Sequence, residues 1–176
     1  MRRIEQERSK TDYSERIEHY LFIELFAFLI MKLREIDKTI TIWLGHYGVK
    51  ALRFSVAIVF IWFGLLKVVD YSPATVLVTE TVYWFNPSWF IPFLGWWEIV
   101  IGFCFIFRPL IRVAIALLAP QMIGTFLPLV LLPHITFQQG SFLLPTLEGQ
   151  YIIKNLVIIA AAMVIGATAR KHHENL

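Results

Sequence analysis

Five polar side chains lie inside long apolar stretches of the sequence and are the residues best placed to do chemistry there. They are Lys67, Glu98, Gln121, Lys154 and Asn155. An ionisable group inside a membrane is costly, so each is a candidate binding residue by default. We therefore predict that these five side chains line a polar pocket within a membrane-embedded set of helices.

Two interpretations of these charges stay open at the sequence level. In the first, Glu98 forms a structural ion-pair network with Lys67 and Lys154 that fixes helix packing. In the second, the excess positive charge beside one carboxylate binds an anionic or quinone-like molecule. Gln121 suits either interpretation, because its amide can hydrogen-bond a neighbouring helix or a ligand carbonyl.

Glycine spacing predicts that these polar groups face other helices and not lipid. Gly64 precedes Lys67 by three residues, and Gly95 precedes Glu98 by three. Residues three apart share a helix face, and small residues on that face let membrane helices approach closely. Gly124, three residues after Gln121, predicts the same close approach on a third helix.

The elements that carry these residues are four apolar segments, each long enough to cross a bilayer at roughly 17–25 residues. They cover about residues 51–69, 90–107, 110–132 and 151–169. The predicted fold is thus an all-α, four-helix integral membrane bundle over residues 51–170. A charged head over residues 1–50 precedes it, and a tail over residues 171–176 follows it.

Composition supports a membrane protein and excludes several other classes. The chain has 176 residues, of which 57% are hydrophobic and 16% charged, whereas a soluble domain carries roughly a quarter charged residues. Its single cysteine, Cys104, forms no internal disulfide or CxxC redox pair. We expect no nucleic-acid partner, because acidic residues are mixed among the basic ones. We predict no metal site, since His134 has no second histidine or cysteine at ligand spacing.

The distribution of Lys and Arg predicts the orientation of the spans. Loops 70–89 and 133–150 contain no Lys or Arg. Basic residues occur instead in the head, in the link between spans two and three, and in the tail. Both termini are therefore predicted to be cytoplasmic. The pocket then lies in the outer half of the bilayer, where an aromatic belt is also expected.

The head contains a nearly continuous apolar run within residues 17–33, which is short for a crossing and has basic residues at both ends. We interpret it as an amphipathic helix that lies in the cytoplasmic interface or packs on the bundle. Apolar residues continue at spacings of three and four through residues 36–47, which predicts a second short interfacial helix.

Three stretches resemble the DoxX-type family of small membrane proteins, nearest the branch that includes a reactive-chlorine-resistance inner-membrane protein. They are residues 53–67 (RFSVAIVFIWFGLLK), Gly95-Trp96-Trp97-Glu98 with Gly102, and residues 148–155 (EGQYIIKN). The resemblance covers about residues 52–170 and does not include the head.

The resemblance implies a multi-pass protein of the bacterial inner membrane. Some relatives are linked to thiosulfate:quinone oxidoreduction, and others to oxidative-stress defence in complexes with soluble enzymes. The expected function is therefore that of a subunit in a quinone-linked or redox-stress system, with a quinone as candidate cofactor and a soluble redox protein as partner. Without a redox-active residue pair, we do not expect electron transfer by this chain alone.

The alternative is a non-enzymatic scaffold or small-molecule carrier whose head recruits a cytoplasmic partner. Self-association into a homo-oligomer is compatible with either function.

Overall fold

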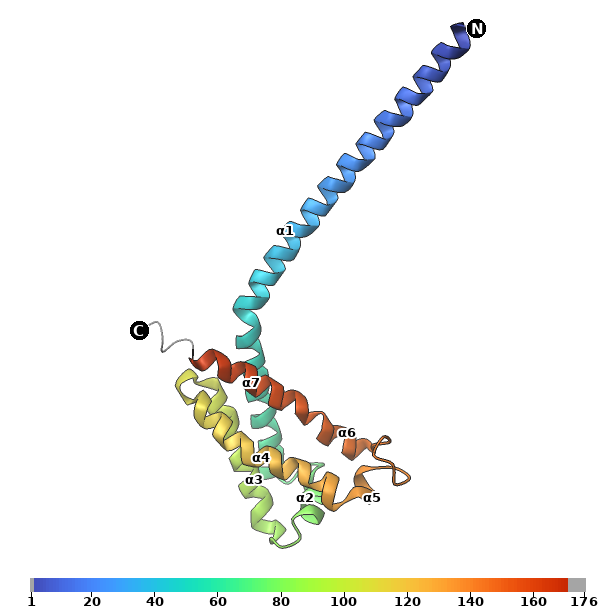
Figure 1. The fold of residues 1–176 in the computed structure, drawn as a ribbon. Coiled ribbons are helices and arrows are strands. Elements are labelled where there is room, and N and C mark those ends of the chain that lie inside the picture. The colour runs from blue at the N-terminus through green and yellow to red at the C-terminus, as the bar shows by residue number, and fades with distance from the viewer. Residues whose placement is uncertain (1, 171–176) are drawn as a thin grey trace. The chain divides into compact units, whose positions relative to one another are not determined.

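The structure, a computed structural model, describes the backbone of residues 2–170 and the side chains of residues 24–26 and 28–169. Helices account for most of this part of the chain, and it contains no β-strand (Figure 1). The elements are α1 (Arg2–Val68), α2 (Thr75–Thr81), α3 (Pro87–Ile106), the 3-10 turn η1 (Arg108–Leu110), α4 (Ile111–Leu131), α5 (Pro133–Thr136), α6 (Leu147–Ile153) and α7 (Asn155–Arg170). The predicted tail over residues 171–176 lies outside the described residues.

Four helical segments are long and apolar enough to cross a membrane: Glu24–Val68, Pro87–Ile106, Arg108–Leu131 and Leu147–Ala169. Each contains most of one of the four predicted spans, so the all-helical character and the four helices of membrane-crossing length expected from the sequence are confirmed. The fourth segment comprises two helices, because α6 ends at Ile153 and α7 begins at Asn155.

The N-terminal helices differ from the prediction. Two separate short helices were expected before the first span, but α1 is helical without a break from Arg2 to Val68. The helix is unbroken because this stretch contains no proline to interrupt it. Before Gly64 its glycines are Gly45 and Gly48, which weaken a helix without breaking it. A single glycine costs a helix only about 1 kcal/mol.

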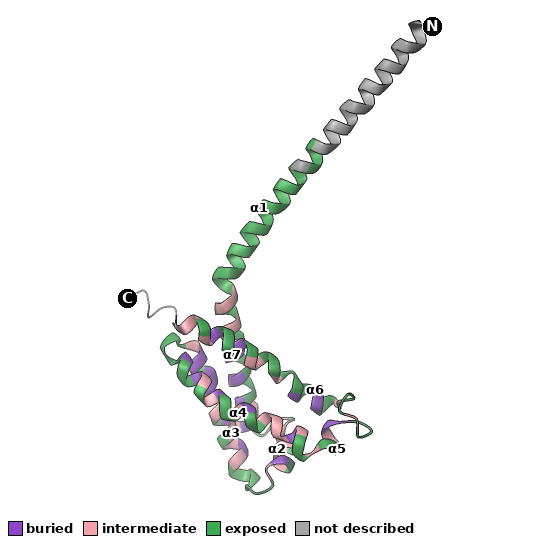
Figure 2. Cartoon of the chain, in the orientation of Figure 1, coloured by how far each residue is buried: buried purple, intermediate pink, exposed green. Residues whose placement is uncertain are grey.

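The contacts divide the chain into two units, Met1–Gly48 and Val49–Leu176. In the first unit, every described side chain from residue 24 to residue 47 is exposed (Figure 2). In the second unit, buried residues occur on every helix that is long enough to cross a membrane.

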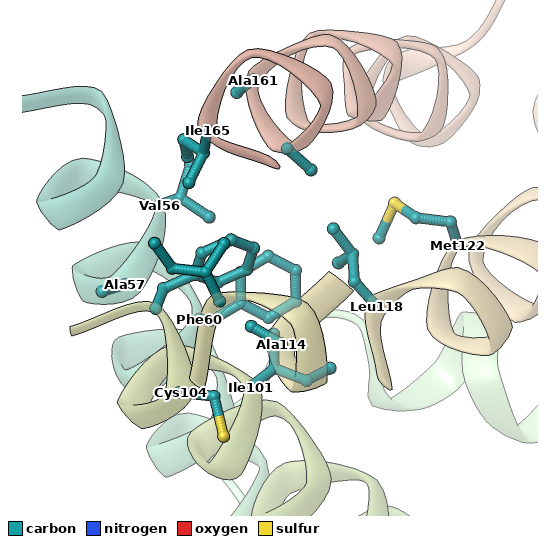
Figure 3. Close-up of a cluster of buried hydrophobic side chains, with 13 residues drawn as sticks. Val56, Ala57, Phe60, Ile101, Cys104, Ala114, Leu118, Met122, Ala161 and Ile165 are labelled. Atoms are coloured by element: carbon teal, nitrogen blue, oxygen red, sulfur yellow. The ribbon is translucent and has the colours of Figure 1, made fainter. Parts of the chain in front are cut away.

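One hydrophobic core joins the helices of the second unit. Its side chains come from the C-terminal part of α1 and from α3, α4 and α7, and they converge between these helices (Figure 3). Alanines in this core shorten the distance between helices, while large side chains such as Phe105 fill the space between them. The core residues are Val56, Ala57, Phe60, Ile101, Cys104, Phe105, Ile111, Ala114, Leu118, Met122, Ala161, Ala162 and Ile165.

Local sequence signals explain where two of the helices begin. Asn86 accepts a hydrogen bond from the backbone N–H of Ser88 at 3.0 Å, and Pro87 occupies the first position of α3, where a missing N–H costs nothing. Thr146 accepts from the N–H of Gly149 at 3.2 Å and so caps α6. These caps position the helices that follow them.

Candidate polar site

A buried ion pair joins the first and third helices of the second unit. The ammonium Nζ of Lys67 donates a hydrogen bond to Oε2 of Glu98 at 2.6 Å, and both side chains are only 9% exposed. Two of the five predicted site residues, 31 positions apart in the sequence, are therefore in direct contact. A charged pair this well buried is costly to desolvate, so its geometry and its further hydrogen bonds decide whether it is stable.

Gln121 brings α4 into the same cluster. Its Nε2 donates to Oε1 of Glu98 at 2.8 Å, so each carboxylate oxygen of Glu98 accepts a hydrogen bond from a different helix. Three predicted site residues thus form one polar cluster across α1, α3 and α4, which we call the Lys67–Glu98–Gln121 cluster. Trp97 adds a further link beside it, because its indole N–H donates to the carbonyl of Leu117 on α4 at 3.3 Å.

Two glycines bring α1 and α3 into close contact at this cluster. A Cβ atom built on Gly64 would lie 2.5 Å from the carbonyl oxygen of Gly95, and one on Gly95 would lie 2.7 Å from that of Gly64. No larger residue fits either position without moving a backbone. The spacing of three residues to Lys67 and to Glu98 therefore marks a helix contact, as the sequence predicted.

The glycine spacing predicted a third close approach that does not occur. A Cβ atom on Gly124 would have nothing within 4 Å. Gly102, four residues after Glu98, extends the contact between α1 and α3 as its spacing predicts, because its Cβ would lie 2.8 Å from the carbonyl oxygen of Ala57.

The end of α1 fixes the position of Lys67. The backbone N–H of Tyr71 donates to the carbonyl of Leu66 at 2.9 Å, and Asp70 between them has a φ of 60°. A left-handed residue just past the last turn is a common helix ending, which Asp adopts more readily than most non-glycine residues. Lys67 therefore lies in the last turn, where the helix dipole favours a cation.

Lys154 and Asn155 do not join this cluster. Lys154 is exposed at the junction between α6 and α7, and its ammonium lies 4.9 Å from the centroid of the Tyr151 ring. Asn155 donates to the backbone carbonyls of Tyr151 at 3.0 Å and Ile152 at 3.1 Å. Among the described residues no hydrogen bond or ion pair joins either residue to Glu98. The predicted network of two lysines around Glu98 is thus replaced by one lysine and one glutamine.

An apolar groove of about 690 Å³ lies between α4 and α7. Its lining includes Leu118 and Met122 on α4 and Ala162 and Met163 on α7, whereas Gln121 is not among the lining residues. No charged side chain lines it. Sequence reasoning missed this groove, because the sequence identifies apolar positions but not the spaces left between them.

The described residues contain no group of three or more His, Cys, Asp and Glu side chains that could hold a metal ion.

Two threonines in the segment between α4 and α6 were not singled out from the sequence. They are buried Thr136 and the capping residue Thr146. The carbonyl of Thr136 accepts from the N–H of Thr146 at 3.0 Å, and Thr146 Oγ1 donates to the carbonyl of Ile135 at 2.7 Å. The spacing of Thr146 from Gly149 is the capping signal that would have indicated this.

Comparisons with known protein families, with curated proteins and with solved structures found no match to this chain.

Proposed function

We propose that this chain is a DoxX-like, four-helix bundle of the bacterial inner membrane that binds a quinone-like molecule at the Lys67–Glu98–Gln121 cluster. The resemblance of residues 53–67, 95–102 and 148–155 to that family supports the choice of family and of ligand class. The shared core of α1, α3, α4 and α7 supports the bundle.

The observation that carries the proposal is a buried donor on Lys67 and a half-buried donor on Gln121, each with spare hydrogen-bonding capacity. The described hydrogen bonds use one of the three N–H groups on Lys67 Nζ and one of the two on Gln121 Nε2. Buried polar groups normally have partners. A ligand oxygen that accepts from Lys67 and Gln121 would supply them, and the carbonyl of a quinone is such an acceptor.

The apolar groove between α4 and α7 supports the same ligand class. The groove is lined by Met122, which follows Gln121 in sequence, and a molecule with a polar ring and an apolar tail would match the chemistry of both features. When bound, a quinone would supply two-electron redox chemistry that no pair of residues in this chain supplies. The chain would therefore act as a subunit with a redox partner protein.

A scaffold or carrier is the second candidate, and one observation favours it. Both oxygens of Glu98 already accept hydrogen bonds from neighbouring helices, which is what a purely structural clamp requires. In that case the head would recruit the partner, and no quinone would bind.

Gln121→Leu distinguishes these two functions. It removes one donor but leaves the Lys67–Glu98 pair intact. We expect the affinity for a short-chain, water-soluble quinone, titrated against the purified protein in detergent, to fall about 2- to 10-fold. The matched control is Gln150→Leu, an exposed position where the affinity should not change. No measurable quinone binding by the unmodified protein would favour the scaffold, and equal affinities of the two proteins would contradict binding at the cluster.

The proposed orientation places both termini in the cytoplasm and the loops between residues 70–89 and 133–150 outside. The absence of Lys and Arg from both loops supports it. So do the exposed aromatic rings of Tyr71, Tyr83 and Trp89, which suit the outer interface. Reporter fusions after Arg112 should report a cytoplasmic location, and fusions after Thr79 a periplasmic one. The reverse pattern would contradict this orientation.

A further inference from the structure

An apolar stripe runs along the part of α1 that belongs to the first unit. Its seven residues recur at alternating spacings of three and four, and all of them are exposed, by 47% to 64%. Figure 2 shows this stretch of α1 as exposed along its whole described length. The stripe consists of Phe26, Leu29, Leu33, Ile36, Ile40, Trp43 and Tyr47.

The alternation of three and four is the a/d pattern of a coiled coil, here sustained over residues 26–47. With Leu33 at an a position, the d positions are Leu29, Ile36 and Trp43. The outward b, c and f positions between residues 33 and 47 are Arg34, Glu35, Lys38, Thr41, Ile42 and Gly45. Ile42 is the one large apolar residue among these six, whereas Phe28 and Met31 occupy c and f positions nearer the start of the stripe, so the back is polar only from Arg34 onward.

We propose that residues 26–47 form a parallel coiled coil with the same segment of a second copy of this chain. The charges beside the stripe select both the partner and the direction. Lys32 occupies a g position and Asp37 the following e position, five residues later. In a parallel, in-register pair, a g residue of one helix lies opposite the next e residue of the other, so Lys32 meets Asp37 twice. In an antiparallel pair centred on the stripe, g positions face g positions, so Lys32 would lie opposite Thr39 or His46 and the pairing with Asp37 would be lost.

The alternative occupant is an anionic lipid surface, against which the charges of this segment argue. A helix lying on such a surface gains from basic residues on its polar face. Here Glu35 and Asp37 are interleaved with Lys32, Arg34 and Lys38. An apolar repeat of 3.5 residues stays in contact with a partner helix along its length only if the two helices supercoil around each other. A lipid surface does not impose such supercoiling.

Disulfide trapping in the full-length chain tests contact and direction. In a Cys104→Ala background, Leu29→Cys and Ile36→Cys should each form disulfide-linked dimers, because d positions face each other in a parallel pair. Lys38→Cys, at the outward f position, is the matched control and should cross-link several-fold less. Equal cross-linking at all three positions, or cross-linking at only one of the two d positions, would overturn the proposal.

Charge reversal distinguishes a second copy from lipid. Asp37→Lys should weaken self-association in detergent, measured by light scattering across protein concentrations, by about 2- to 30-fold for two lost pairs. Adding Lys32→Asp to the same chain should restore it. If lipid were the occupant, Asp37→Lys would leave the mass unchanged and strengthen binding to anionic vesicles. That result would also overturn the proposal.

Discussion

Replacing Glu98 with glutamine is expected to lower the free energy of unfolding by about 3–5 kcal/mol, because it leaves the buried ammonium of Lys67 without a counter-charge. The measurement is equilibrium unfolding of the purified protein in detergent. Glu80→Gln is the matched control, since Glu80 is exposed on α2 and its loss should change stability by no more than about 0.5 kcal/mol.

The double variant Lys67→Met/Glu98→Gln shows whether this cost comes from the pair. Lys67→Met alone also leaves a buried charge unpaired, whereas the double variant removes both charges together. Its destabilisation should therefore be smaller than that of either single variant, because no unpaired charge stays buried. Strictly additive effects would mean that the two side chains do not interact.

Gly64→Ala is expected to produce the second large loss of stability. The added Cβ would lie 2.5 Å from the backbone oxygen of Gly95, which cannot yield as a flexible side chain would. The two helices must separate, at a cost of about 1–3 kcal/mol or more. The separation also stretches the Lys67–Glu98 hydrogen bond one turn away, so quinone affinity should fall as well.

Gly124→Ala is the matched control for this prediction. Gly124 also lies inside a membrane-length helix, but an added Cβ meets nothing within 4 Å. Alanine should therefore stabilise α4 by about 0.5–1 kcal/mol, since glycine is the poorer helix former. Thermal unfolding of both variants compares them directly, and equal destabilisation would contradict the account of the glycine contact.

Much of the fold could be predicted from the sequence because the membrane imposes simple rules. Apolar segments of span length marked the four helical regions, and the spacing of Gly64 to Lys67 and of Gly95 to Glu98 marked the face on which α1 meets α3. These signals are local. They depend only on residue type and helical period.

The sequence could not predict which polar residues would meet. Lys154 was placed beside Glu98 from its expected depth, but depth does not fix the direction in which a side chain points. The helix is interrupted at Lys154, between α6 and α7, and the ammonium lies against Tyr151 instead. The sequence also did not predict that α1 continues without a break. An apolar pattern indicates which residues share a helix face, but it does not show where one helix ends and the next begins.

The quinone content of the purified protein tests the central claim most directly. Quinone would be extracted from the unmodified chain and from Lys67→Met/Glu98→Gln, both taken from bacterial membranes, and quantified per chain. Because the double variant removes both charges and leaves no unpaired one buried, a thermal melt should show both proteins folded. We predict stoichiometric quinone in the unmodified chain and little in the double variant. The account would be contradicted if both proteins carried the same amount, or if the unmodified chain carried none.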